Sequence, residues 1–188
     1  MNRTNSKFSV KNLVLGALFL ALALVLPFFT GQIPQIGAML CPMHLPILLA
    51  GFICGGPVGA VVGFIAPLLR MVFGMPPFYV AIAMAFELLT YGLVSGIMYR
   101  KVFKKQTVGT LYGSLLIAMV AGRIVWGIVK VILSGIAADA GAFTFAAFIS
   151  GALLNAIPGI VVQLILVPAI VVALQKAKLI EAPSAEKA

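Results

Sequence analysis

Long apolar runs fill most of the chain, and short stretches of Gly, Pro and basic residues separate them. The runs are about 20 residues long, the length at which an α-helix crosses the hydrocarbon core of a bilayer. They lack the alternation of apolar and polar positions that the strands of a membrane barrel show. The pattern therefore predicts an all-α membrane protein with six transmembrane helices, at residues 12–29, 38–54, 57–73, 78–99, 108–133 and 143–174.

The second and third runs are separated only by "CGGP", residues 54–57. The joined run is too long for one span, because a bilayer needs about 20 helical residues. Gly and Pro are the residues that most often break a helix and form a turn. We therefore predict a tight re-entrant turn here.

Composition supports a membrane protein: 63% of the residues are hydrophobic and only 9% are charged, too apolar for one soluble core. Basic residues precede the first run and follow the fourth and the sixth, whereas the loops after the first, third and fifth have none. By the positive-inside rule both termini lie inside the cell (N-in/C-in). The expected organisation is a cytoplasmic N-terminus at 1–11, a membrane domain at 12–175 and a cytoplasmic, disordered tail at 176–188. The net charge of +9 is thus a topology signal, with a secondary attraction to anionic lipid, and does not indicate nucleic-acid binding.

Several polar residues interrupt the apolar runs and gather toward the outer side of the predicted bundle. They are His44, Arg70, Glu87, Arg123, Lys130 and Asn155. A charge at this depth costs at least a few kcal/mol, so such residues face a cavity or one another. Glu87 is either a helix-locking bridge to Arg70 or Arg123, or a ligand contact. The three cations outnumber the one carboxylate, so pairing alone does not account for all of them.

The fifth run carries a distinctive helical face. In "AGRIVWGIVKVI", Arg123, Trp126 and Lys130 are spaced three and four residues apart, which puts them on one side of a helix. This face suits a small anionic or aromatic ligand. Trp126 could instead belong to the interfacial belt, and Lys130 could extend to the outer surface. Asn155, shortly before Pro158, either adds an amide to the site or marks an ordinary proline kink.

Metal and enzyme chemistry are disfavoured. Cys41 and His44 are three residues apart, but two ligands make a poor metal site, so no metal or cofactor is expected. "CPMHLP" is more typical of a helix that begins at the mouth of a cavity. Of four acidic residues only Glu87 lies clearly within a run, which argues against paired-carboxylate catalysis. We predict that the protein is not an enzyme.

The first run contains Ala17 and Ala21, four residues apart and next to Gly16, a small-residue stripe against which another helix can pack. With this stripe, "CPMHLPILLAGFICGGPVGAVVGFIAPLLR" and "AMAFELLTYGLVSG", the chain resembles the substrate-binding S component of energy-coupling factor (ECF) transporters. The resemblance covers nearly the whole chain and is most specific from Cys41 to Gly96.

The resemblance implies a multi-pass protein of the bacterial cell membrane that captures a vitamin or related micronutrient from outside. It implies as partners a transmembrane coupling subunit, contacted by Ala17 and Ala21, and two ATPase subunits. It also implies that residues 30–37 help to cover the ligand and that the S component topples to release it. The sequence has no GxxxxGK[ST] motif that would bind nucleotide, in keeping with an external energy source.

The substrate class is left open between several candidates. Nickel and cobalt are disfavoured, because relatives that transport them use a His near the N-terminus and "MNRTNS" has none. The surplus of cations ranks a pantothenate-like acid first. A neutral pyridoxine-like, pyrimidine or nucleobase compound would instead use Glu87, Asn155 and Trp126. A different class, an autonomous small carrier, would use Glu87 and His44 as relay groups.

Overall fold

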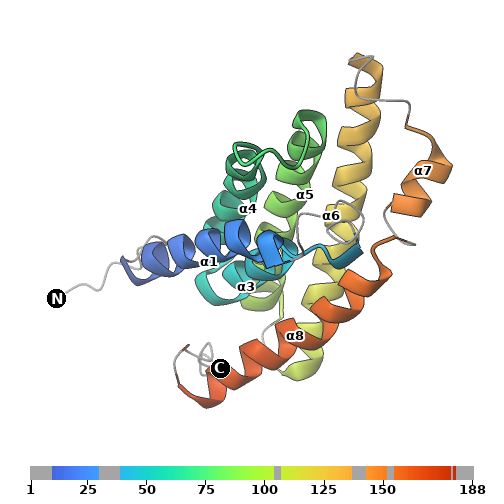
Figure 1. Ribbon diagram of the computed structural model, residues 1–188. Helices are drawn as coiled ribbons and strands as arrows, with labels where there is room; N and C mark the ends of the chain where they lie inside the picture. The colour runs from blue at the N-terminus through green and yellow to red at the C-terminus, as the bar shows by residue number, and fades with distance from the viewer. Residues whose placement is uncertain are drawn as a thin grey trace.

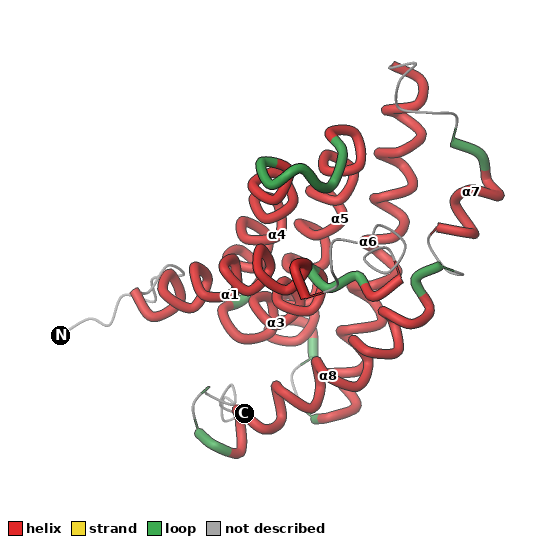
Figure 2. Tube along the Cα trace, viewed as in Figure 1, coloured by secondary structure: helices red, strands yellow, loops and turns green. Residues whose placement is uncertain are grey.

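The computed structural model describes residues 10–29, 39–103, 107–136, 143–151, 155–178 and 180. Within these ranges the protein contains helices and no strand, which confirms the all-α prediction (Figures 1 and 2). The loop 30–37, most of the N-terminal segment and the tail from residue 181, for which we made predictions, lie outside them. The elements are α1 (Val10–Phe29), α3 (His44–Cys54), α4 (Gly56–Met71), α5 (Phe78–Ile97), the π-helical turn η1 (Met98–Val102), α6 (Val108–Ile136), α7 (Phe145–Ile149) and α8 (Ile157–Lys176).

Four helical stretches are long and apolar enough to cross a bilayer: α1, α5 with η1, α6 and α8. The apolar helices α3 and α4 are shorter, with 11 and 16 residues. The protein is thus a multi-pass membrane protein. The count of six spans and the inward position of both termini stay predictions.

The predicted bounds of the second and sixth spans are wrong. Instead of one helix over 38–54, α3 starts only at His44, because the backbone of Cys41 is left-handed, with φ of 47°, and Pro42 follows it. Instead of one helix over 143–174, the short α7 precedes α8. Pro158 lies in the first turn of α8, where its missing N–H leaves no hydrogen bond unmade. This proline begins a helix rather than kinking one.

The predicted turn at 54–57 is present, and Gly55 makes it. Its φ of 95° is readily available only to a residue without Cβ, and the residue ends α3 and begins α4. Arg100 of η1 closes the same end of α3: its Nε donates to the carbonyl of Phe52 at 3.2 Å and its Nη2 to that of Ile53. A cation at a helix C-terminus also offsets the partial negative charge there.

The backbones of α3, α4 and α5 approach one another closely. A Cβ added to Gly59 would lie 2.7 Å from the Cα of Gly51 on α3 and 2.8 Å from the carbonyl oxygen of Gly92 on α5. Real Cβ atoms essentially never come so near. In lipid, where no hydrophobic effect drives helices together, such small-residue contacts supply much of the packing energy.

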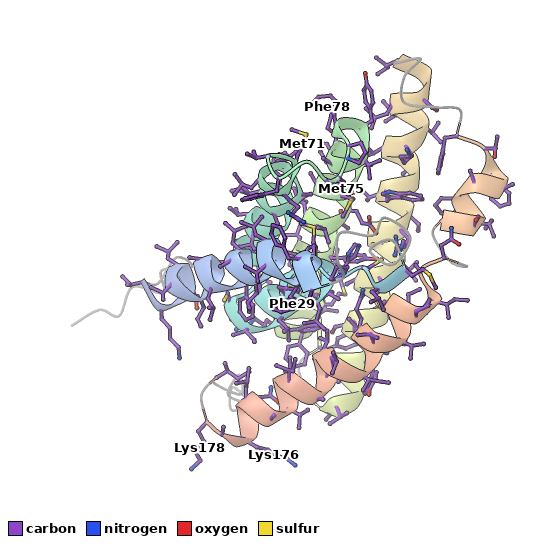
Figure 3. The ribbon with its side chains drawn as sticks, in the orientation of Figure 1. Phe29, Met71, Met75, Phe78, Lys176 and Lys178 are labelled. Atoms are coloured by element: carbon purple, nitrogen blue, oxygen red, sulfur yellow. The ribbon has the colours of Figure 1, made fainter. Side chains whose placement is uncertain are left out.

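The other helices surround this centre (Figure 1). α1 packs on α3 and α4, α6 packs on α5, and α8 contacts α3 and α6. Met71 and Phe78 lie at one end of the bundle and Lys176 and Lys178 at the other (Figure 3). We call these the Phe78 end and the Lys176 end. Gln175 of α8 donates from Nε2 to the hydroxyl oxygen of Tyr99 at 2.9 Å, which fastens α8 near the Lys176 end.

Replacement of Gly59 by Ala is expected to lower the free energy of unfolding by about 1–3 kcal/mol, because the added Cβ forces two backbones apart. The matched control is Gly135→Ala, whose Cβ would meet no atom within 4 Å. Thermal unfolding of the detergent-purified variants measures the stability of each. Similar melting temperatures for the two variants would contradict close packing at Gly59.

Candidate functional site

Glu87 is the central residue of the buried polar cluster. It lies on α5, within an apolar stretch, and is 1% exposed. Its Oε1 is 2.9 Å from Nη1 of Arg123 on α6 and 3.3 Å from Nε2 of His44 at the start of α3. One carboxylate oxygen thus connects three helices.

The ion pair is required by the burial of Glu87. An isolated carboxylate in such surroundings would be strongly destabilising, and a nearby cation offsets much of that penalty. Of the two bridges that the sequence left open, Glu87 with Arg70 or with Arg123, the structure contains the second. A ligand contact by Glu87 stays a prediction, since an ion pair and a ligand contact can coexist in one site.

The late start of α3 brings His44 to Glu87. Eleven helical residues extend only about 16 Å, roughly half of the hydrocarbon thickness. Glu87 lies near the middle of the α5–η1 stretch. Because His44, the first residue of α3, contacts Glu87, α3 begins at about the same depth. No side chain caps the start of α3. The backbone N–H of His44 instead donates to the carbonyl of Cys41 at 3.0 Å. The positive end of the α3 dipole is therefore close to the cluster.

Two nitrogens of the cluster, Nδ1 of His44 and Nε of Arg123, are buried and have no hydrogen-bond partner among the described residues. The Nη2 of Arg123 lies 3.7 Å from Sγ of Cys41, a weak hydrogen bond. Buried polar atoms are seldom left unsatisfied in folded proteins. The cluster therefore has hydrogen-bonding capacity to offer to a small molecule or to water.

Arg70 lies apart from this cluster, in the last turn of α4. It is 2% exposed, and its guanidinium is 4.1 Å from the ring centre of Phe28 and 5.7 Å from that of Phe73. These cation–π contacts stabilise the charge only in part. Nη1 of Arg70 is buried and has no hydrogen-bond partner in the described part of the chain.

Helix register explains why Arg70 does not reach Glu87. Gly63 of α4 packs directly against the backbone of Leu88, the neighbour of Glu87. Arg70 is seven residues further along α4, or about 10 Å toward the Phe78 end.

Trp126 and Lys130 face a different neighbour from Arg123, although the sequence predicted one common face. The Trp126 ring is 5.4 Å from the ring centre of Phe143 and 6.2 Å from that of Phe148 on α7. The Nζ of Lys130 is 5.7 Å from the centre of the Phe143 ring. α6 thus presents Arg123 to α5, and Trp126 and Lys130 to α7 and the residues just before it.

Asn155 has local partners and is exposed. Its Nδ2 donates to Oγ of Ser150 at 3.4 Å, and its backbone N–H donates to the Ser150 carbonyl at 2.9 Å. Among the predicted site residues, the structure therefore brings together His44, Glu87 and Arg123. The others lie in three separate places: Arg70 near Phe28, Trp126 and Lys130 near Phe143, and Asn155 near Ser150.

Two buried residues were missed by the sequence analysis. Tyr91, one turn after Glu87 on α5, packs edge-on against His44 with 5.2 Å between ring centres. Gln163 of α8 is 2% exposed, and its Oε1 has no partner among the described residues. The same signal that marked Glu87, a polar residue inside an apolar run, was present for Gln163.

The described residues contain no group of three or more His, Cys, Asp or Glu side chains that could hold a metal ion.

A protein-family model described as "ECF transporter, substrate-specific component" matches residues 11–171, most of the chain. No curated protein and no solved structure matches the chain. The matched range includes the whole cluster and all of α1 except its first residue.

Replacement of Glu87 by Gln is expected to destabilise the ligand-free protein by about 3–5 kcal/mol, because it leaves Arg123 buried without its counter-charge. Thermal unfolding of Glu87→Gln, Arg123→Gln and the double variant measures the coupling energy between the two side chains. The double variant should be more stable than the sum of the two single losses implies. Additive losses would show that the 2.9 Å contact contributes no coupling energy.

Proposed function

The chain belongs to the family of substrate-specific components of ECF transporters, and from this premise we propose that it captures a pantothenate-like acid outside the bacterial cell membrane. Family members bind a transport substrate and are not enzymes. The proposed partners are a transmembrane coupling subunit and two ATPase subunits. The coupling subunit and the ATPases would deliver the acid to the cytoplasm.

The surplus of buried positive charge is the observation that carries this proposal. Glu87 is the only acidic residue in the described part of the chain, and its carboxylate is already paired with Arg123. Arg70 is more deeply buried than Arg123, and among the described residues it contacts aromatic rings and no carboxylate. A substrate carboxylate would supply the missing counter-charge and a strong, charge-assisted hydrogen bond.

The Glu87 cluster suits the uncharged part of such an acid. Pantothenate-like compounds carry hydroxyl and amide groups besides the carboxylate, and these can both donate and accept hydrogen bonds. His44 Nδ1 and Arg123 Nε are available for them, close to the start of α3. We propose that the acid binds between this cluster and Arg70, about 10 Å further toward the Phe78 end.

A neutral pyridoxine-like, pyrimidine or nucleobase substrate is the second candidate. It is favoured by the ion pair itself, since Glu87 and Arg123 neutralise each other at 2.9 Å and need no further anion. A neutral substrate would leave Arg70 without a counter-charge, and for this reason we rank a neutral substrate second. An autonomous carrier would transport without ATPases, so uptake that strictly requires co-expressed ATPases excludes it.

The predicted docking residues lie on a free face of α1. Ala17 and Ala21 are exposed, whereas Gly16, Phe19 and Ala23 are buried against the bundle. A smooth exposed stripe allows close approach of a partner helix in the membrane. We propose that the coupling subunit packs there.

We expect thermal stabilisation of the purified protein by pantothenate-like acids and not by neutral compounds in a panel of vitamins and precursors. Arg70→Gln should weaken binding of the acid by roughly 10- to 100-fold, the loss of one charge-assisted hydrogen bond. Lys101→Gln, a change of an exposed cation at the Lys176 end, is the matched control. Preference for a neutral compound, with equal affinity in Arg70→Gln, would overturn the proposed substrate class.

We expect Ala17→Trp and Ala21→Trp to reduce uptake in cells that express the whole transporter while ligand affinity stays unchanged, because the indole holds a partner helix away. The control is Leu116→Trp on α6, another exposed apolar position. If both α1 variants take up substrate as well as the control does, the docking face is elsewhere.

A further inference from the structure

An open apolar groove of about 530 Å³ lies between α6 and the segment that contains α7. Both sides of it are built from large apolar side chains, several of them more than half exposed. The lining includes Ile124, Ile128, Val131 and Ile132 of α6 with Phe145 and Phe148 of α7. α7 lies beside α6 and away from the α3–α4–α5 centre (Figures 1 and 2).

Lys130 lies next to the groove without being part of its lining. Its Nζ is near the Phe143 ring, which also lines the groove, and the described residues offer it no carboxylate. The middle of α6, a helix of 29 residues, is near Gly122, so Lys130 lies about 12 Å from it. The hydrocarbon core extends about 15 Å from its centre. A lysine at this depth can extend its ammonium group to the phosphates of the lipid headgroups.

We propose that the groove binds one acyl chain of an anionic phospholipid of the outer leaflet, whose phosphate pairs with Lys130. The apolar lining from Ile132 back to Ile124 then follows the chain toward the bilayer centre. The hydroxyl of Thr144, which also lines the groove, is a second polar group. The site is separate from the Glu87 cluster and does not depend on which substrate the protein carries.

Charge distinguishes this occupant from two others. A polar vitamin would find almost no hydrogen-bonding groups in the groove. A second copy of the chain would bring no carboxylate to Lys130 from its described surface, since Glu87 is the only acidic residue described and is 1% exposed. An anionic lipid supplies both the apolar chain and the negative charge.

Trp126, the chain's single tryptophan, reports on the site because its ring packs on Phe143 and Phe148, which line the groove. Bromine atoms on an acyl chain quench tryptophan fluorescence on contact. The experiment reconstitutes the protein in phosphatidylcholine vesicles that contain a fixed fraction of brominated phosphatidylglycerol. Parallel vesicles contain the same fraction of brominated phosphatidylcholine with unlabelled phosphatidylglycerol.

We expect brominated phosphatidylglycerol to quench Trp126 with an about fivefold preference over brominated phosphatidylcholine, which corresponds to about 1 kcal/mol for one lysine. Lys130→Gln should abolish the preference and Lys130→Arg should retain it. Lys101→Gln, at the other end of the bundle, should leave it unchanged.

Each other outcome overturns the proposal. Equal quenching by the two brominated lipids means that bulk lipid fills the groove. A preference that persists in Lys130→Gln means that the headgroup binds elsewhere. Absence of quenching means that protein covers the groove, and quenching that falls as the protein-to-lipid ratio rises identifies a second copy as the occupant.

Discussion

The carboxylate of Glu87 lies inside the bundle, and its ion pair with Arg123 sets how α5 and α6 meet. Charges at this depth are costly in lipid, so any arrangement that separated the two would be strongly disfavoured. The same oxygen contacts His44, which fixes the level at which α3 begins. The short α3, its uncapped start and the unsatisfied nitrogens of His44 and Arg123 all lie around this one interaction.

The cations of the membrane domain have different neighbours, and we therefore assign them different roles. Arg123 is neutralised by Glu87, Arg70 is held by the rings of Phe28 and Phe73, and Lys130 lies beside Phe143 at the groove. Only the first has a carboxylate among the described residues. The remaining positive charge of the described residues therefore lies toward the Phe78 end for Arg70 and beside the α6–α7 groove for Lys130, which is the basis for the proposed anionic substrate and the proposed anionic lipid.

The glycine contacts of α3, α4 and α5 give the bundle a rigid centre, while α1 covers it with one face and leaves the other free. Backbones in such close contact cannot move separately without losing their packing. A partner that bound the free face of α1, where Ala17 and Ala21 are exposed, would then act on the outside of a stable unit. This division agrees with a subunit that binds substrate by itself and receives energy from others.

The sequence by itself determined the all-helical membrane class, the turn at Gly55, the family resemblance and the position of Glu87 inside an apolar helix, because length, apolar content and isolated charges are local properties of the chain. It did not determine which charges meet. Arg123, Trp126 and Lys130 share a helical spacing, yet the tertiary structure divides them, since the neighbours of α6 differ along its length. The left-handed Cys41 and the role of Pro158 as a helix start also escaped prediction, because a proline or an apolar run is compatible with more than one backbone path. Only the packing of one helix against the next decided the partners of Glu87, the aromatic surroundings of Arg70 and the groove beside α7.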